Sequence, residues 1–138
     1  MATLKISELS VGDWVGVRCG TKINAFKVEE IRFNNIIHKY VVLLNNKTYG
    51  LPTTELHPIP ITAEILEKNG FESTTKPNVF TLTHGKLQLY VSNELDGWYI
   101  SFVNFMERLC ILQVIRKSYI HELQHALRLA GVEKEINL

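Results

Sequence analysis

Short segments in which apolar and polar residues alternate make up most of this chain, and turn-forming residues separate them. In the first half, such segments recur about every ten residues, and side chains that alternate with a period of two line opposite faces of a strand. Asn45 and Asn46 tolerate positive φ and predict a hairpin turn. Residues 1–60 are therefore expected to form a small SH3-like β-barrel. The predicted strands cover residues 11–17, 25–31, 39–44 and 47–51.

A proline-rich stretch, His57-Pro58-Ile59-Pro60, separates the two halves of the chain. Proline disfavours helix in the residue before it and cannot donate to a central ladder. The chain is therefore expected to be α+β, with the barrel over residues 1–60 and an antiparallel sheet with two helices over residues 61–138. One continuous domain over both parts stays open, since 138 residues suit a single domain.

The second half carries two helix signals with strand signals between them. Thr62 as an N-cap and Gly70 as a stop predict a short helix, and Ser118 and Gly131 bound a longer one. Alternating segments between the helices predict an antiparallel meander. The predicted strands are 79–83, 87–92, 98–103 and 109–115; residues 105–114 are alternatively helical, and the tail 133–138 is expected to pair with a sheet edge.

Charge and cysteine content narrow the function classes. Fifteen basic and 14 acidic residues leave a net charge of +1, so no overall field favours DNA or a membrane. The longest apolar stretch, residues 40–44, is far shorter than the ~18 residues of a membrane-spanning helix. Cys19 and Cys110 lie far apart and predict reduced thiols. Because the N-terminus lacks a secretory signal, we expect a cytoplasmic protein with no membrane partner.

The segment His-Glu-Leu-Gln-His at 121–125 matches H-E-x-x-H, the zinc-binding pattern of many metallohydrolases. A catalytic zinc needs a third protein ligand, and no histidine follows His125. At 100° per residue, Ile120, Leu123 and Leu127 point towards the core, whereas His121 and His125 are predicted to face solvent. A zinc metallohydrolase is therefore the least favoured alternative, and we expect no catalytic residue, no metal ligand and no cofactor.

The interval from Ile31 to Thr54 contains no acidic residue. Basic side chains next to exposed aromatic rings are typical of proteins that bind single-stranded nucleic acid. The favoured alternative is that the tyrosines fill the barrel and the lysines protect a sheet edge, because three cations are few for phosphate contacts. The residues concerned are Arg32, Lys39 and Lys47, interleaved with Phe33, Tyr40 and Tyr49.

A second candidate site lies at the start of the last predicted helix. Arg116 and Lys117 precede this helix, whose N-terminal N–H groups and partial positive charge favour an anion. With His121 they could receive a phosphate, while Trp98 or Tyr99 stacks on a base. These five residues are the predicted ligand-binding residues, and a surface pair of cations is the competing interpretation.

Three segments resemble a family of small uncharacterised proteins of gut bacteria and of their phages and prophages. Residues 58–72, PIPITAEILEKNGFE, resemble the family's PIPLTEEILLKxGFE segment. Residues 9–15, LSVGDWV, look like its LRIGNLV start, and residues 119–125, YIHELQH, look like its YVHQLQN helix. In the family pattern, Gln stands in place of Glu122 and Asn in place of His125, which implies that the zinc-like pentapeptide is particular to this chain.

The resemblance implies an accessory protein of a mobile element, among which inhibitors of host defence are frequent. The leading hypothesis is therefore a non-enzymatic binding protein of a phage or prophage, acting in the cytoplasm of the bacterial host cell. Its expected role is counter-defence, in which it sequesters, as a sponge, a nucleotide-type immune signal, or captures a host protein. The alternative is an SH3-like nucleic-acid-binding accessory protein, and a homo-oligomer or protein–protein adaptor stays open.

Overall fold

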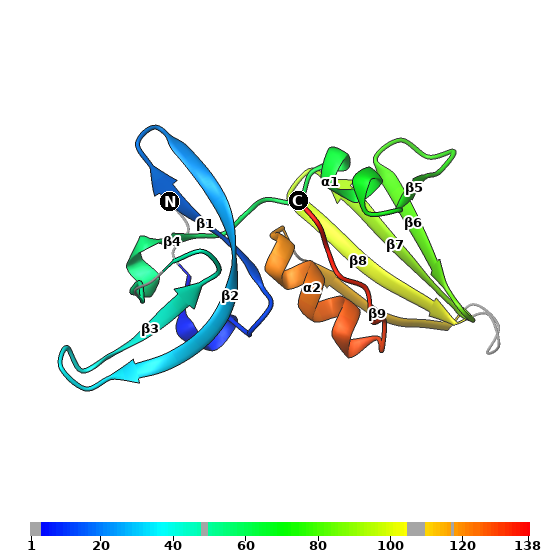
Figure 1. Cartoon of the computed structure of the whole chain (residues 1–138). Helices are drawn as coiled ribbons and strands as arrows, with labels where there is room; N and C mark the ends of the chain where they lie inside the picture. Colours follow the sequence, from blue (N-terminus) through cyan, green and yellow to red (C-terminus); the bar gives the residue numbers. More distant parts are fainter. Residues whose placement is uncertain (1–3, 48–49, 105–109, 117) are drawn as a thin grey trace. The chain divides into compact units, whose positions relative to one another are not determined.

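The computed structural model describes residues 4–47, 50–104, 110–116 and 118–138, with the backbone alone for residues 104 and 110–116. The chain divides into two units, Met1–Ile59 (unit 1) and Pro60–Leu138 (unit 2), both of which are drawn in Figure 1. Each unit combines an antiparallel sheet with short helices. The α+β class predicted from the sequence is confirmed.

Unit 1 contains a four-stranded antiparallel sheet in the order β3-β2-β1-β4. The long strand β2, 13 residues, pairs with β1 through its first half and with β3 through its second half. A register shift between Val28 and Glu30 lies where β2 changes partner, and such irregularities bend a strand. No closed ring of strands is formed among the described residues, so the predicted SH3-like barrel is not confirmed. The elements are η1 (Ile6–Glu8), β1 (Trp14–Cys19), β2 (Lys22–Asn34), β3 (Lys39–Leu44), η2 (Thr53–Glu55) and β4 (Leu56–His57).

The turn after β3 forms at the two asparagines, as predicted. Asn46 has a φ of 62°, and Oδ1 of Asn45 accepts a hydrogen bond of 2.7 Å from the Lys27 amide. Residues 48–49 of the predicted strand 47–51 lie outside the described residues, and Leu51 forms an isolated antiparallel bridge with Val42. The inner face of unit 1 is an apolar core, made of Leu4, Leu9, Val15, Val28, Val42, Leu44, Leu51 and Leu56.

Unit 2 contains a five-stranded antiparallel sheet in the order β5-β6-β7-β8-β9, which confirms the predicted meander. In the described part of the segment with two competing predictions, the backbone of residues 110–116 forms a strand, β9, that pairs with β8 from Asn104↔Cys110 to Tyr99↔Arg116. Residues 105–109 of the predicted helix and strand lie outside the described residues. The side chain of Cys110 lies outside the described part. The elements are α1 (Ala63–Lys68), β5 (Glu72–Ser73), β6 (Val79–His84), β7 (Leu87–Glu94), β8 (Gly97–Asn104), β9 (Cys110–Arg116) and α2 (Ile120–Leu129).

Both helices of unit 2 end where the sequence predicts, but the second begins later. Thr62 caps α1, since its Oγ1 accepts a hydrogen bond from the Ile65 amide at 3.2 Å. The N-cap of α2 is Tyr119 and not the predicted Ser118. The Ser118 carbonyl accepts a hydrogen bond of 2.9 Å from the Ile61 amide, and Tyr119 forms an antiparallel bridge with Pro60. These bonds keep the backbone extended at Tyr119 and delay the helix by one residue.

The apolar face of α2 is wider than the helical wheel indicates. His121 is 3% exposed, so the prediction that it faces solvent is wrong, and Gln124 is also buried. The rings of Tyr119 and His125 lie beside that of His121, each with its centroid 6.0 Å away. The imidazole thus has two aromatic rings beside it, and a wheel gives the direction of a side chain but not what covers it.

The C-terminal tail bonds to a side chain and not to a sheet edge as predicted. No strand is assigned to residues 132–138. Instead, Asn69, 5% exposed, donates from Nδ2 to the Asn137 carbonyl and accepts at Oδ1 from the Asn137 amide, both at 2.7 Å. The amide group of Asn69 thereby bonds the backbone N–H and C=O of Asn137 as a neighbouring strand would. Val132 and Ile136 are buried along the tail.

Candidate functional site

Of the two aromatic residues predicted to stack on a ligand, one is buried. Trp98 is 8% exposed, and its ring centroid lies 6.1 Å from that of Phe80. Tyr99 is half-buried on the opposite face of β8, and its hydroxyl bonds both carboxylate oxygens of Asp96 at 3.0 and 2.9 Å. Tyr99 is therefore the more exposed of the two predicted stacking residues.

The predicted phosphate residues are only partly brought together. The backbone places Arg116 directly opposite Tyr99 on neighbouring strands. Lys117 lies outside the described residues, and His121 is buried within α2. Of the five predicted ligand-binding residues, the backbone brings Arg116 and Tyr99 next to each other. The anion site therefore stays a prediction that rests on these two residues.

The zinc-like motif has two histidine rings close together. The imidazoles of His121 and His125 meet edge to face at 83°, with 6.0 Å between centroids. Among the described residues, no group of three His, Cys, Asp or Glu side chains is arranged to hold a metal ion. The third ligand that a catalytic zinc needs is therefore not found in the part of the chain that the structure describes.

The acid-free interval 31–54 contains two exposed aromatic rings. Phe33 and Tyr40 are cross-strand partners on β2 and β3, with exposed fractions of 46% and 52%. Their rings meet edge to face, with centroids 5.3 Å apart. The interpretation that Tyr40 fills the core is wrong, and Tyr49 lies outside the described residues.

The position of these rings follows from the alternation of the strands. Ile31 and Val42, each two residues away, point to the same face, where Val42 is completely buried. The hairpin of β2 and β3 extends beyond the core. The last cross-strand pair on this face, Phe33 and Tyr40, is therefore exposed. Phe33 and Tyr40 are thus core-type residues at a place where the core has ended.

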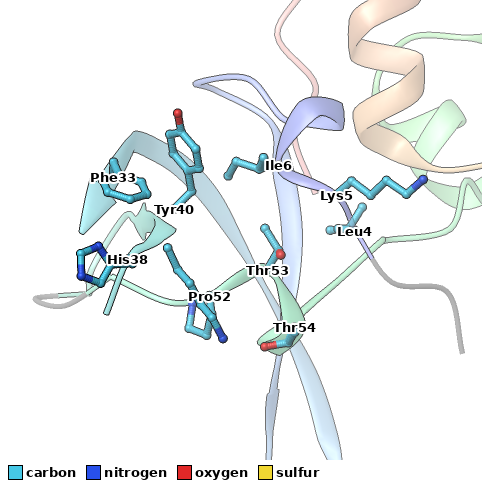
Figure 2. A pocket seen from close by; sticks show the side chains of 10 residues that line it. Leu4, Lys5, Ile6, Phe33, His38, Tyr40, Pro52, Thr53 and Thr54 are labelled. Atoms are coloured by element: carbon cyan, nitrogen blue, oxygen red, sulfur yellow. The ribbon is translucent and has the colours of Figure 1, made fainter. Parts of the chain in front are cut away.

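A pocket of about 600 Å³ lies at this end of unit 1. Figure 2 shows Phe33, His38 and Tyr40 on one side of it and the N-terminal segment around Ile6 on the other. The apolar lining residues are Leu4, Ile6, Phe33, Tyr40 and Pro52, and the polar ones are Lys5, His38, Lys39, Thr53 and Thr54. Such a mixture of apolar walls and a few polar groups is typical of small-molecule sites.

The three cations of the acid-free interval, Arg32, Lys39 and Lys47, do not share one place on unit 1. Lys39 lines the pocket. Arg32 neighbours Phe33 along β2 and so belongs to the opposite face of the strand. The ammonium group of Lys47 lies 5.0 Å from the centre of the Phe26 ring. The cations at the pocket are therefore Lys39 and Lys5.

Sequence reasoning missed the wall of the pocket opposite the hairpin. Residues 4–6 and 52–54 carry no ligand-binding pattern, and folding alone brings them next to β2 and β3. The signal that did exist was the acid-free interval with its aromatic residues.

Comparisons with models of protein families, with curated proteins and with solved structures found no match to this chain. Within the described ranges, none of the helices has the length and apolar character needed to cross a membrane. The pocket of unit 1 and the Tyr99–Arg116 pair therefore have to be judged on their own chemistry.

Proposed function

We propose that this chain is a non-enzymatic binding protein that captures a nucleotide-type ligand in the pocket of unit 1. The observation that carries the proposal is the half-exposed ring pair of Phe33 and Tyr40 beside the cations of the same pocket. A base stacks on an aromatic ring, and an ammonium group binds a phosphate. The chemistry of the pocket thus suits a molecule that carries both groups.

Size and charge favour a short ligand. A volume of about 600 Å³ lies within the range of small-molecule sites, roughly 300–1,000 Å³. Lys5 and Lys39 provide two permanent positive charges at the pocket. Tight binding of a long strand normally engages more phosphates, on the order of 6–10, so two cations suit a mononucleotide or a short oligonucleotide better.

The biological role that we propose is counter-defence, in which the protein sequesters a nucleotide immune signal in the cytoplasm of the bacterial host. The resemblance to a phage-associated family supports this role. For unit 1 we further propose an SH3-like arrangement, which the shared strand β2 and the pairing of β1 with β4 support. Capture of a host protein stays the alternative within the same role.

Single-stranded nucleic acid is the second candidate ligand. The exposure of Tyr40 favours it, because the competing interpretation required this ring to be inside the core. A strand of DNA or RNA that crosses the ring pair would place phosphates near Lys39. Its affinity would fall with salt, but with a shallow slope, since few counterions are released.

Isothermal titration with a panel of linear and cyclic nucleotides and short oligonucleotides tests the proposal. We expect at least one ligand with micromolar or tighter affinity. Phe33→Ala and Tyr40→Ala should each weaken its binding about tenfold, because one stacked base contributes about 1–3 kcal/mol. Lys39→Gln should lower the affinity for phosphorylated ligands and leave the affinity for the free nucleoside unchanged.

Two control variants locate the site. Ile23→Ala removes a side chain of β2 that is 50% exposed but does not line the pocket, and it should bind normally. Arg116→Ala tests the competing site opposite Tyr99. A ligand lost in Arg116→Ala and kept in Phe33→Ala would move the site to unit 2, and a panel without any binding would contradict the proposal.

A further inference from the structure

The turn between β2 and β3 presents two isoleucines to solvent. Ile36 is 89% exposed and Ile37 is 49% exposed. Oδ1 of Asn34 accepts hydrogen bonds from the amides of both, at 2.9 and 3.3 Å, and His38 has a φ of 51°. We call residues 35–38 the hairpin tip. Its side-chain–backbone bonds hold the two isoleucines in place before any partner arrives.

Two positively charged side chains flank the hairpin tip. Arg32 and Lys39 are exposed on the two strands next to it. The interval 31–54 contains no carboxylate, and the nearest one along β2 is Glu30. In the part of unit 1 that the structure describes, no ion pair engages Arg32 or Lys39. An anionic partner therefore meets cations that are not already neutralised.

Apolar and charged groups are ordered along the hairpin. The isoleucines stand at its end, and the pairs Asn34↔Lys39, Phe33↔Tyr40 and Arg32↔Val41 follow in that order. At a rise of about 3.3 Å per residue, the ring pair and both cations lie within roughly 10 Å of the tip. This length is comparable with the depth, about 5–10 Å, to which an interfacial amphipathic helix buries its apolar face in the boundary between headgroups and acyl chains.

The net charge of +1 predicts no membrane partner, but the charge near the tip is locally positive. We propose that the hairpin tip inserts into the headgroup region of an anionic membrane surface. The isoleucines would enter the apolar boundary, while Arg32 and Lys39 contact anionic headgroups. Phe33 and Tyr40 would lie at the interface, where amphipathic aromatic rings are enriched. A fluid lipid surface accepts apolar side chains that stand out on several sides, whereas a protein partner would need a socket of matching shape.

Sedimentation with vesicles tests this inference on the full chain. Vesicles of phosphatidylcholine mixed with phosphatidylglycerol should bind the protein, and pure phosphatidylcholine should bind it weakly. The double variant Ile36→Ser/Ile37→Ser should lower partitioning into vesicles about tenfold or more, because it lacks the two apolar side chains whose transfer from water to the membrane favours binding. Arg32→Gln/Lys39→Gln should remove the preference for anionic vesicles, and added salt should have the same effect on the unchanged protein.

Leu95→Ser provides the matched control. Leu95 is 109% exposed in the turn between β7 and β8, where its neighbours are Glu94 and Asp96. Its substitution should not change the binding to vesicles. No binding to either vesicle, or equal binding by the double variant, would overturn the inference and leave a protein partner as the occupant of the tip. Nucleotide titration of the double variant should stay normal, since neither isoleucine lines the pocket.

Discussion

Asn69 joins the end of α1 to the C-terminal tail through a single buried side chain. Besides its two bonds to Asn137, its Nδ2 donates to the Ile65 carbonyl at 2.8 Å. Asn69→Ala removes all three partners and should lower the free energy of unfolding by about 1–3 kcal/mol. Urea denaturation measures the loss, with Asn35→Ala, an exposed asparagine, as a control expected to change it by less than about 0.5 kcal/mol. Equal stability of the two variants would contradict the structural role of Asn69.

The exposure of single polar residues is where sequence reasoning failed most. The helical wheel of α2 places Ile120, Leu123 and Leu127 correctly in the core. It places His121 in solvent, whereas this residue is buried and the ring of the N-cap residue Tyr119 stacks on its imidazole at 10° between planes. A wheel gives the direction in which a side chain points but not which other side chains cover it. Burial of this kind therefore has no periodic signal.

Among the elements, α1 offers the sharpest test of a local signal. Thr62→Ala removes the oxygen that accepts the Ile65 amide and should destabilise unit 2 by about 1 kcal/mol. Thr62→Ser keeps that oxygen and serves as the control. Circular dichroism during urea unfolding measures both variants, and an unchanged midpoint in Thr62→Ala would show that the cap contributes nothing.

Elements with complete local signals were predicted, and elements defined by distant partners were not. The meander of β6, β7 and β8 follows from alternation and from turns that contain glycine. The late start of α2 depends on Ile61, which pairs with Ser118 from the other end of unit 2. The same limit applies to the candidate site, because alternation gives the face of Phe33 and Tyr40 but not the point where the core beneath them ends.

At the scale of the whole molecule, both units contain buried apolar residues, and charge is distributed unevenly along the chain. Residues 1–60 carry seven basic and five acidic side chains, and residues 61–138 carry eight and nine. The near-neutral total therefore combines a weakly basic half with a weakly acidic one. The candidate pocket and the hairpin tip both lie in the basic half, which agrees with the anionic ligands proposed for them.

The two tryptophans make the stability of each unit measurable in the intact chain. Trp14 lies in β1 of unit 1 and Trp98 in β8 of unit 2. Trp98→Phe leaves a reporter of unit 1, and Trp14→Phe leaves a reporter of unit 2. Leu44 and Leu89 are completely buried, one in each unit. Their truncation to alanine should cost about 2–5 kcal/mol each.

We expect Leu44→Ala to lower the urea midpoint reported by Trp14 more than the one reported by Trp98. Leu89→Ala should have the reverse effect, because each unit contains buried apolar residues of its own, as a domain does. The fluorescence of each single-tryptophan protein, followed through the same urea series, measures the four midpoints. Equal shifts of both reporters in both variants would show that the chain unfolds as one cooperative unit in spite of its division into two compact units.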